Sequence, residues 1–415
     1  MKVLVVGSGK VGSEIARDLA GSSEVDSVIV ADAQPKNLKN VRGIEKIRTR
    51  RLDISQRKPL LDAMRRVDLI CGALPGRLGF QLMTYAVEAH RDLVDISYTP
   101  ENPFKLHRKA RDQENVIVPQ CGVAPGFTNM CVGDASRRLG TIAKVRVFVG
   151  GLPQKPTPPL NYRIVFSLED VINEYSRPAR IIEHGKEKLV DALSGRGSLN
   201  FPGVGRLEYF ITDGLGSLPR SFPRVREMFE YTLRYPGHAE MMNTLRILGF
   251  FDREEVQVNG TGVVPQKLSI ALLRGAMSLG RPEDLLALRV EVEGKLGRKS
   301  MLSYRILDYY DPKSKVSAMA RTTAYPCTSA ALLVGRKKLK SVGVVTPEKI
   351  AMDPRHFEFV RSRLEDRGVK VAMPPAWLIL PWASYQELTP VISTLCLQQS
   401  CQFQAIARPQ IDLIA

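Results

Sequence analysis

Three glycines near the start of the chain constrain the fold more than any other feature. Residues 3–6 are an apolar run of strand length, followed by Gly-Ser-Gly-Lys-Val-Gly and an amphipathic stretch over 11–20. The first glycine permits a tight turn out of the strand, the second lets the backbone approach a pyrophosphate, and the third allows close packing of helix on strand. The pattern predicts a dinucleotide-binding loop, whose residues are Gly7, Ser8, Gly9, Lys10, Val11 and Gly12.

Asp32 follows the second apolar run of strand length. A carboxylate at that position binds ribose hydroxyls and repels a 2′-phosphate, which favours NAD over NADP. Lys36 and Lys39 follow closely and are able to bind such a phosphate, so NADP is the less favoured alternative. Asp53 comes after the third expected strand, where it would lie beside the adenine or cap a helix. The loop after the fourth strand is also expected at the cofactor and contains Ala73, Leu74 and Pro75.

Short apolar runs alternate with amphipathic stretches over the first 120 residues, which is typical of a parallel sheet with helices on both faces. The runs of strand length are residues 3–6, 27–31, 67–72, 92–96 and 115–119. The stretches expected to be helical are residues 11–20, 58–66, 80–89 and 103–113. This part of the chain therefore predicts a Rossmann sheet.

After residues 122–125 the pattern changes to many extended segments with few helices. We expect strands at 145–150, 161–166, 206–214, 228–234, 255–258, 287–293, 301–307 and 316–321, and helices at 168–175, 239–248, 265–277 and 354–367. Such a pattern predicts a mixed, mostly antiparallel domain. The predicted fold class is α/β, with a Rossmann dinucleotide-binding domain (1–124), an inserted mixed α+β substrate domain (125–324) and a C-terminal segment (325–372) that returns to the Rossmann domain.

Residues 373–415 differ in composition from the rest of the chain. Their only charged residues are Glu387, Arg408 and Asp412, and both tryptophans of the chain, Trp377 and Trp382, lie there. The segment is apolar but has no helical or strand periodicity. The sequence leaves open whether it covers a subunit surface, contacts a membrane, is disordered or is an out-of-frame extension.

Charge and cysteine content exclude several classes of protein. The chain has 60 Lys and Arg against 43 Asp and Glu, a net charge of +17, but the surplus is spread along it without a nucleic-acid motif, so no nucleic-acid partner is expected. The six cysteines form no C-x-x-C pair, so we expect neither a metal site nor a disulfide framework. No apolar run approaches the roughly 20 residues needed to cross a bilayer. The chain opens on a strand-like run rather than a signal peptide, so we expect a cytoplasmic protein without a membrane partner.

Seven segments together point to a known family. They are GALPG (72–76), VDISYTPENP (94–103), GVAPGFTN (122–129), VGGLP (149–153), TDGL (212–215), RYPGHAE (234–240) and MARTT (319–323). In this order they resemble the saccharopine dehydrogenase-like family, and within it the L-lysine 6-dehydrogenases. The resemblance covers residues 1–372 and implies a Rossmann domain interrupted by a substrate domain.

The resemblance implies oxidative deamination of the L-lysine ε-amine with NAD, giving the semialdehyde by way of an imine. The family also includes saccharopine dehydrogenases and enzymes of carboxypolyamine synthesis, so an NADP-dependent imine reductase is the alternative. A non-catalytic dinucleotide-binding protein is a second alternative. All the enzymatic alternatives interconvert a C–N single bond and an imine by hydride transfer. Family members form homo-oligomers, so we expect a homodimer or larger assembly that acts on a small amino-acid or amine substrate.

Amine oxidation requires a base that removes the proton from the nitrogen. His238 opens a helix in the RYPGHAE segment, where the helix N-terminus favours a neutral imidazole, so we expect it to be this base, with a helix cap as the alternative. Glu240 is expected to orient His238 or to bind an ammonium group, with a plain carboxylate of the first helical turn as the alternative. Asp95 follows the fifth strand, at the edge where open parallel sheets bind ligands. Gly122 and Val123 lie at the crossover between domains and are expected near the nicotinamide.

An amino-acid substrate also presents a carboxylate and an ammonium group to its site. Asp213, in a loop after a strand, is expected to accept the ammonium group, with an Asp-Gly turn residue as the alternative. Tyr98 follows the fifth strand at its carboxyl end, where substrate is also expected. Arg180 and Arg163 are candidates for the carboxylate, although arginines at the surface are the alternative. Tyr162 is expected to shape the pocket, with packing in the core as the alternative.

Overall fold

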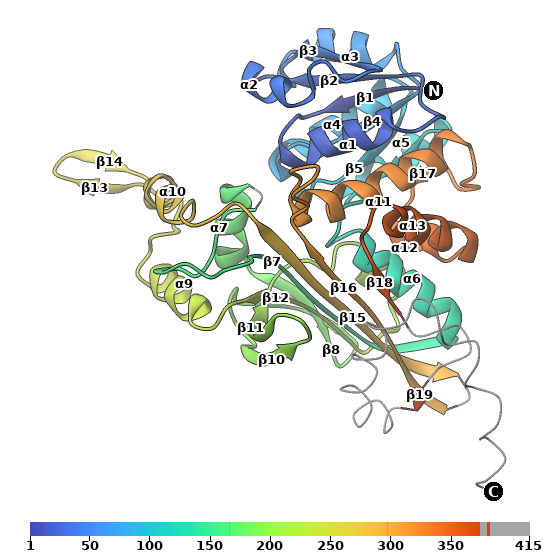
Figure 1. Ribbon diagram of the computed structural model, residues 1–415. Coiled ribbons are helices and arrows are strands. Elements are labelled where there is room, and N and C mark those ends of the chain that lie inside the picture. The colour runs from blue at the N-terminus through green and yellow to red at the C-terminus, as the bar shows by residue number, and fades with distance from the viewer. Residues whose placement is uncertain (166, 297, 374–379, 382–415) are drawn as a thin grey trace, which may run out of the picture.

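The computed structural model describes residues 1–165, 167–296, 298–373 and 380–381. The first part of the chain forms a parallel sheet with the strand order β17-β6-β5-β4-β1-β2-β3 (Figure 1). Its central strands β1 and β4 are almost wholly buried, because helices cover both faces, and this explains their unbroken apolar runs. The strands are β1 (Lys2–Val6), β2 (Ser27–Asp32), β3 (Ile47–Arg51), β4 (Leu69–Gly72), β5 (Asp92–Asp95), β6 (Val116–Val118) and β17 (Gly343–Val344).

The helices expected at 11–20, 58–66, 80–89 and 103–113 are found within a few residues, and the structure adds two short helices between β2 and β3 that no amphipathic stretch predicts. They are α1 (Lys10–Ala20), α2 (Pro35–Leu38), η1 (Lys39–Val41), α3 (Arg57–Met64), α4 (Gly76–Glu88), η2 (Pro103–Leu106) and α5 (His107–Asp112). The apolar face of α1 packs on one side of the sheet, and those of α3, α4 and α5 pack on the other. The Rossmann arrangement expected from the sequence is confirmed.

A second, large sheet has the strand order β10-β11-β12-β7-β15-β16-β18, with β8 and β9 beside β12 and with β19 beside β16. Only β12 and β7 pair in parallel within this described sheet, so the expected mixed, mostly antiparallel domain is also confirmed. The strands are β7 (Thr141–Pro153), β8 (Ala179–Glu183), β9 (Lys186–Val190), β10 (Gly197–Phe201), β11 (Gly205–Ile211), β12 (Glu227–Arg234), β15 (Asp284–Leu296), β16 (Arg298–Tyr309), β18 (Val371–Ala372) and β19 (Leu380–Pro381).

The helices of this second part lie at the ends and faces of the large sheet. They are α6 (Phe127–Leu139), α7 (Leu168–Ser176), α8 (Leu218–Ser221), α9 (His238–Ile247) and α10 (Pro265–Ala276). The hairpin of β13 (Val256–Val258) and β14 (Thr261–Val263) projects with α10 from the body of the protein (Figure 1). Residues 161–165, expected to be extended, form no strand.

The sequence pattern also predicts an extended segment at 316–321, and the structure contradicts this. The segment holds the first turn of α11 (Ala318–Gly335). Ser317 caps that helix through its hydroxyl, and the Asp284 carboxylate accepts the N–H of Ala318 at 2.7 Å. The Ser317 and Asp284 side chains thus accept N–H groups that the first helical turn leaves free. Because Asp284 lies on the distant strand β15, a tertiary contact helps to override the local extended pattern.

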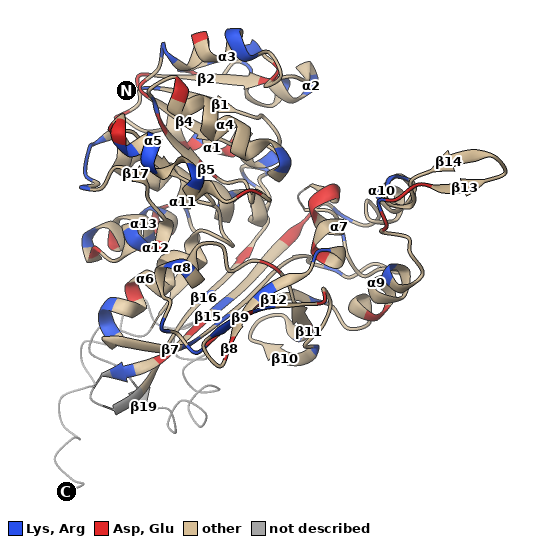
Figure 2. Cartoon of the chain, turned by 180° about the vertical axis from the view of Figure 1, so that it is seen from behind, with Lys and Arg blue, Asp and Glu red and all other residues tan. Residues whose placement is uncertain are grey.

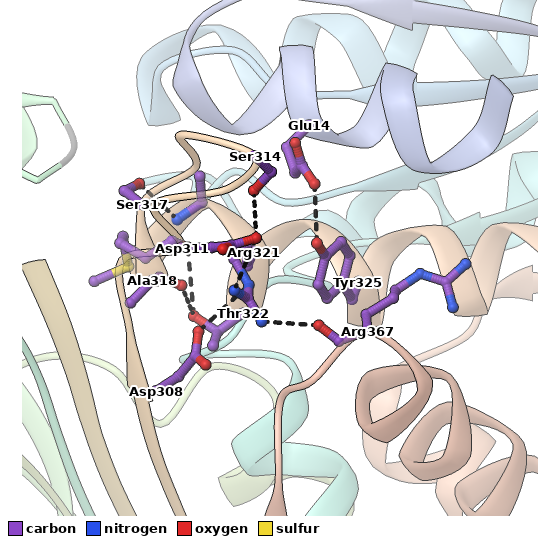
Figure 3. A network of polar contacts seen from close by, with 12 residues as sticks. Glu14, Asp308, Asp311, Ser314, Ser317, Ala318, Arg321, Thr322, Tyr325 and Arg367 are labelled. Atoms are coloured by element: carbon purple, nitrogen blue, oxygen red, sulfur yellow. Dashed lines mark hydrogen bonds and ion pairs between the residues drawn. The ribbon is translucent and has the colours of Figure 1, made fainter. Parts of the chain in front are cut away.

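Helix α11 joins the two sheets. Arg321 lies within ion-pair distance of Asp308 on β16, at 3.6 Å, and donates to the Arg367 carbonyl at 2.8 Å (Figure 3). One helical turn further on, the Tyr325 hydroxyl donates to Glu14 of α1 at 2.9 Å. The apolar core follows the same path, from α1 and the first sheet through α11 to α6 and the large sheet.

The chain returns to the first sheet after α11 through β17, α12 (Pro347–Ala351) and α13 (Pro354–Asp366). Asp18 of α1, only 6% exposed, pairs with Arg363 of α13 at 3.1 Å and with Arg367 just beyond it. These contacts hold the returning segment against α1. Met373 and β19 aside, residues 373–415 lie outside the described residues, and so do the alternatives expected for that segment.

Lys and Arg are interspersed with Asp and Glu along both parts of the chain (Figure 2). The surplus of 17 positive charges therefore does not mark a single element. Within the described residues, no helix is both long enough and apolar enough to cross a membrane.

Candidate active site

A cavity of about 560 Å³ lies where the carboxyl ends of the first sheet face the large sheet. Loops after β1, β2, β4 and β5 form one side, and β7, β12, α7 and the start of α11 form the other. Open parallel sheets bind ligands at this edge. The residues expected at the site that do line the cavity are Gly7, Gly9, Lys10, Val11, Gly12, Asp32, Ala73, Leu74, Pro75, Tyr98, Gly122, Val123 and Asp213.

The glycine loop has the geometry that its motif predicts. Gly7 has φ +100°, and a Cβ there would overlap the carbonyl oxygen of Ala73. A Cβ at Gly12 would overlap the carbonyl oxygen of Gly7, so both positions require glycine for packing. At Gly9 no atom lies within 4 Å of such a Cβ, and no side chain caps the N-terminus of α1. The loop therefore leaves open space and unpaired N–H groups for a pyrophosphate.

Asp32 is held in a fixed orientation at the end of β2. Its carboxylate accepts the backbone N–H groups of Ser8 and Gln34, each at 2.7 Å, and the side-chain amide of Asn37 at 3.2 Å. Asp32 and Asn37 both line the cavity, whereas the Ser8 side chain is buried behind the loop. A carboxylate and a carboxamide beside an open phosphate loop suit the ribose of a dinucleotide.

Asp95 is buried beneath the cavity rather than in its lining. Its Oδ1 accepts the N–H and the hydroxyl of Ser97, which lines the cavity, and its Oδ2 has no hydrogen-bond partner among the described residues. Burial raises the pKa of Asp95 to about 6, although the Ser97 bonds oppose this. Asp95 thus supports the turn Ile96–Tyr98 from below.

Arg177 organises one part of the cavity wall. Its Nε lies 3.3 Å from the Asp213 carboxylate, and its guanidinium lies 4.8 Å from the centre of the Tyr98 ring. Arg177 therefore brings Asp213 and Tyr98 together, a contact between two distant segments of the chain. Arg180 donates its backbone N–H to Asp213 at 3.4 Å, and its guanidinium group interacts with Tyr98 and Asp213, but Arg180 does not line the cavity. Arg177, which the sequence did not single out, lines the cavity instead.

Arg234 organises a second part of the wall. Its Nη2 donates to Glu174 at 2.9 Å, and its guanidinium lies 4.4 Å from the centre of the Tyr162 ring. Arg234 and Glu174 line the cavity, but Tyr162 lies behind them. The expected role of Tyr162 is therefore corrected from lining the pocket to supporting Arg234.

The structure does not bring His238 into the cavity. The side chain is fully buried, with Nδ1 2.7 Å from the Leu160 carbonyl and Nε2 2.9 Å from the Tyr175 hydroxyl. Because a carbonyl only accepts, Nδ1 carries the proton and Nε2 accepts from Tyr175. Burial, and then the Arg234 cation, lower the pKa of His238 to about 3. Both nitrogens are occupied, which corrects the prediction of a base that touches substrate.

Three other predicted residues also lie away from the cavity. Glu240 is exposed in the first turn of α9, a common place for a carboxylate. Arg163 donates to backbone carbonyls, among them that of Gly280 at 2.8 Å. Asp53 accepts the N–H of Ser55 at 2.9 Å, as a turn residue before α3. Backbone contacts thus account for Arg163 and Asp53, and Glu240 is a plain first-turn carboxylate, so the expected site roles of the three are corrected.

Glu230 is one of the acidic residues of the wall that the sequence did not reveal. It lies on β12, is only 4% exposed and lines the cavity. The Thr212 hydroxyl donates to its carboxylate, and burial raises the pKa of Glu230 to about 8. A signal was present, because Glu230, Thr232 and Arg234 occupy alternate positions on the buried face of one strand. Polar residues at such positions require a partner or a function.

Models of protein families match almost the whole described chain. Residues 3–118 match the saccharopine dehydrogenase NADP binding domain, and residues 122–369 match the saccharopine dehydrogenase C-terminal domain.

Curated relatives and solved structures agree with these matches. A carboxyaminopropylagmatine dehydrogenase of Synechocystis sp. is 25% identical over 85% of this chain and 94% of its own length. An alpha-aminoadipic semialdehyde synthase of Arabidopsis thaliana is 29% identical over 63% of this chain, which spans only 28% of that longer protein. The apo saccharopine dehydrogenase (L-Glu forming) of Saccharomyces cerevisiae has a similar structure, with a TM-score of 0.70 and 18% identity, covering 90% of this chain and 99% of that one.

Proposed function

Since the chain belongs to the saccharopine dehydrogenase family, we propose that it is an NAD(P)-dependent oxidoreductase that interconverts an amine and an imine in a small substrate. The observation that carries this proposal is the cavity, which joins the glycine loop to the wall built on Arg177, Arg234 and Glu230. In oxidation, the carbon attached to nitrogen gives up a hydride, the nitrogen gives up a proton, and a C=N bond remains. The nicotinamide ring, when bound, accepts the hydride.

A secondary amine, whose C–N bond joins two amino-acid-like or polyamine-like parts, is the first substrate class in this proposal. Similarity over nearly the full length of a carboxyaminopropylagmatine dehydrogenase supports it. Arg177 and Arg234 offer guanidinium groups for a carboxylate, and Asp213 offers a carboxylate for an ammonium group. Oxidative deamination of the lysine ε-amine is the second candidate, supported by the resemblance of residues 234–240 and the other segments to the L-lysine 6-dehydrogenases.

The proposed cofactor is a nicotinamide dinucleotide, with NAD preferred over NADP. The fixed carboxylate of Asp32 supports NAD, since it would repel a 2′-phosphate. The matching family model is described as an NADP binding domain, which supports the opposite preference. Measurement of the affinity for both nucleotides decides between them.

A homodimer or larger assembly also stays a prediction, which sedimentation of the full chain would test.

The test follows the absorbance of reduced nucleotide with the full chain. The secondary-amine class is tested in both directions. Oxidation is measured with L-saccharopine and NAD⁺ or NADP⁺. Reduction is measured with NADPH and one of two substrate pairs, L-lysine with 2-oxoglutarate or α-aminoadipic semialdehyde with L-glutamate. L-lysine with NAD⁺ alone tests deamination. Nucleotide binding without turnover of any amine would refute the enzymatic proposal and support a dinucleotide-binding protein.

A glycine pair provides matched controls for the cofactor loop. Gly9→Ala places a methyl group in the open space of the loop without backbone strain, so nucleotide binding should weaken at least tenfold. Gly275→Ala, in the distant helix α10, also meets open space and should leave binding unchanged. Equal nucleotide affinities of the two variants would contradict the assignment of the loop.

A further inference from the structure

The acidic side chains of the cavity wall are not all neutralised. Arg177 pairs with Asp213 and Arg234 pairs with Glu174. In the part of the chain that the structure describes, no Lys or Arg side chain forms an ion pair with Glu230. An unpaired carboxylate at 4% exposure is costly to keep, and such groups concentrate where a protein carries out chemistry.

The backbone of β12 directs Glu230 to the cavity. Residues 228, 230, 232 and 234 alternate with the others along the strand and share its buried face. Glu230, Thr232 and Arg234 of this face line the cavity. The carboxylate is therefore part of the wall and not of the apolar core behind it.

Two hydroxyl groups connect the carboxylate to the rest of the wall. Thr212 donates its one hydroxyl proton to Glu230, and the hydroxyls of Thr212 and Thr232 are 2.8 Å apart. The Thr232 hydroxyl must then donate to Thr212, since Thr212 has no second proton. When the carboxyl group is protonated, it can donate to Thr212 instead. The three groups thus form a hydrogen-bonded chain whose direction can reverse.

We propose that Glu230 accepts the proton from the substrate nitrogen during amine oxidation and returns it during imine reduction. This inference rests on the proposed function. The balance of the step is complete: an N–H bond breaks, its proton goes to the Glu230 carboxylate, the electron pair of that bond forms the C=N bond, and the C–H pair leaves as hydride to the oxidised nucleotide.

The charges around Glu230 suit a group that must both take and release a proton. Burial disfavours its ionised form most strongly, and the carboxylates of Glu174 on α7 and Asp213 after β11 act in the same direction. The Thr212 hydrogen bond and the Arg234 cation oppose them. The resulting pKa of about 8 lies close to neutral pH, and a general base is most effective when its pKa is near the working pH.

The experiment compares the wild-type chain with Glu230→Gln, Glu230→Asp and the matched control Glu227→Gln. Glu227 lies on the same strand but pairs with Lys144 at the surface, outside the cavity. The oxidation rate is measured between about pH 6 and about pH 10, on the substrate that the wild type turns over. Infrared difference spectra of the same proteins, without substrate, follow the titration of buried carboxyl groups.

We expect kcat/KM of the wild type to rise with pH through an apparent pKa near 8. Glu230→Gln should lower kcat by roughly 10²–10⁴-fold, remove that limb of the profile and abolish a carboxyl band that titrates near the same pH. Glu230→Asp should keep the limb at a reduced rate, and Glu227→Gln should behave as the wild type.

Three outcomes would contradict the inference and differ from one another. Turnover by Glu230→Gln with an unchanged pH profile would remove Glu230 from the reaction. A slower Glu230→Gln variant that keeps the limb would assign Glu230 a structural role only. Absence of turnover by the wild type on every amine would refute the proposed function itself, and the inference with it.

Discussion

The buried carboxyl group of Glu230 makes the stability of the fold depend on pH in a way that needs no substrate to measure. Its pKa is about 8 in the folded chain and about 4.3 in an unfolded one. Between these values the native state binds more protons than the unfolded state, so the free energy of unfolding falls as pH rises. The full difference between the two pKa values corresponds to a change of about 5 kcal/mol in the free energy of unfolding. About 4 kcal/mol of this change occurs between pH 5 and pH 9.

Replacement of Glu230 by Gln removes this dependence, because the amide is neutral throughout. Relative to the wild type, Glu230→Gln should therefore gain about 4 kcal/mol of stability from pH 5 to pH 9. Asp95, which is also buried with a raised pKa, contributes equally to both proteins and cancels in the comparison. Urea unfolding at a series of pH values measures the difference, and Glu227→Gln is the control.

Parallel stability curves for the wild type and Glu230→Gln would refute the reasoning. They would mean that the Glu230 carboxyl group ionises in the folded protein at the same pH as in the unfolded one. The same result would remove the electrostatic support for the proton transfer inferred above.

Three further changes test other parts of the structure. Asp32→Ala should weaken NAD binding and shift the affinity ratio toward NADP, as measured by titration with both nucleotides; an unaltered ratio would remove Asp32 from cofactor selection. Asp18→Asn leaves Arg367 without its buried partner and should lower the free energy of unfolding by about 3–5 kcal/mol, whereas Asp366→Asn, at an exposed position of α13, should change it by less than about 0.5 kcal/mol. His238→Ala should lower stability by about 2–4 kcal/mol through the loss of two buried hydrogen bonds, while nucleotide binding persists; loss of turnover at unchanged thermal stability would restore His238 as a reacting group.

The first half of the chain could be predicted from sequence because its signals are local. Glycine is required at Gly7 and Gly12 because a Cβ at either position would overlap a nearby backbone carbonyl oxygen. The apolar runs mark strands that are buried on both faces. The edge strand β3 shows the limit of this signal. It carries Arg48, Arg50 and Arg51 and is mostly exposed, so it is expected only from the place of Asp53 and has no apolar run of its own.

The cavity wall was harder to predict because it depends on contacts between distant segments. His238 has the residue type and helix position of a base, but the Leu160 carbonyl and Tyr175 occupy its two nitrogens. The side chains that do face the cavity, Arg234 and Glu230, lie on an ordinary strand with no motif around the carboxylate. Only the pairing of β12 with β7 and β11 establishes which face of that strand is buried.

The late position of β17 in the chain has a consequence for biosynthesis. β17 pairs with β6, so the first sheet stays incomplete until Gly343 and Val344 have left the ribosome. At a synthesis rate of about 5–20 residues per second, the edge of β6 waits roughly 10–45 s for its neighbour. During that interval a nascent chain exposes an apolar, unpaired strand edge, the kind of surface that chaperones bind and that promotes aggregation. Expression at lower temperature or with chaperones should therefore raise the yield of folded protein more than changes to the exposed helices would.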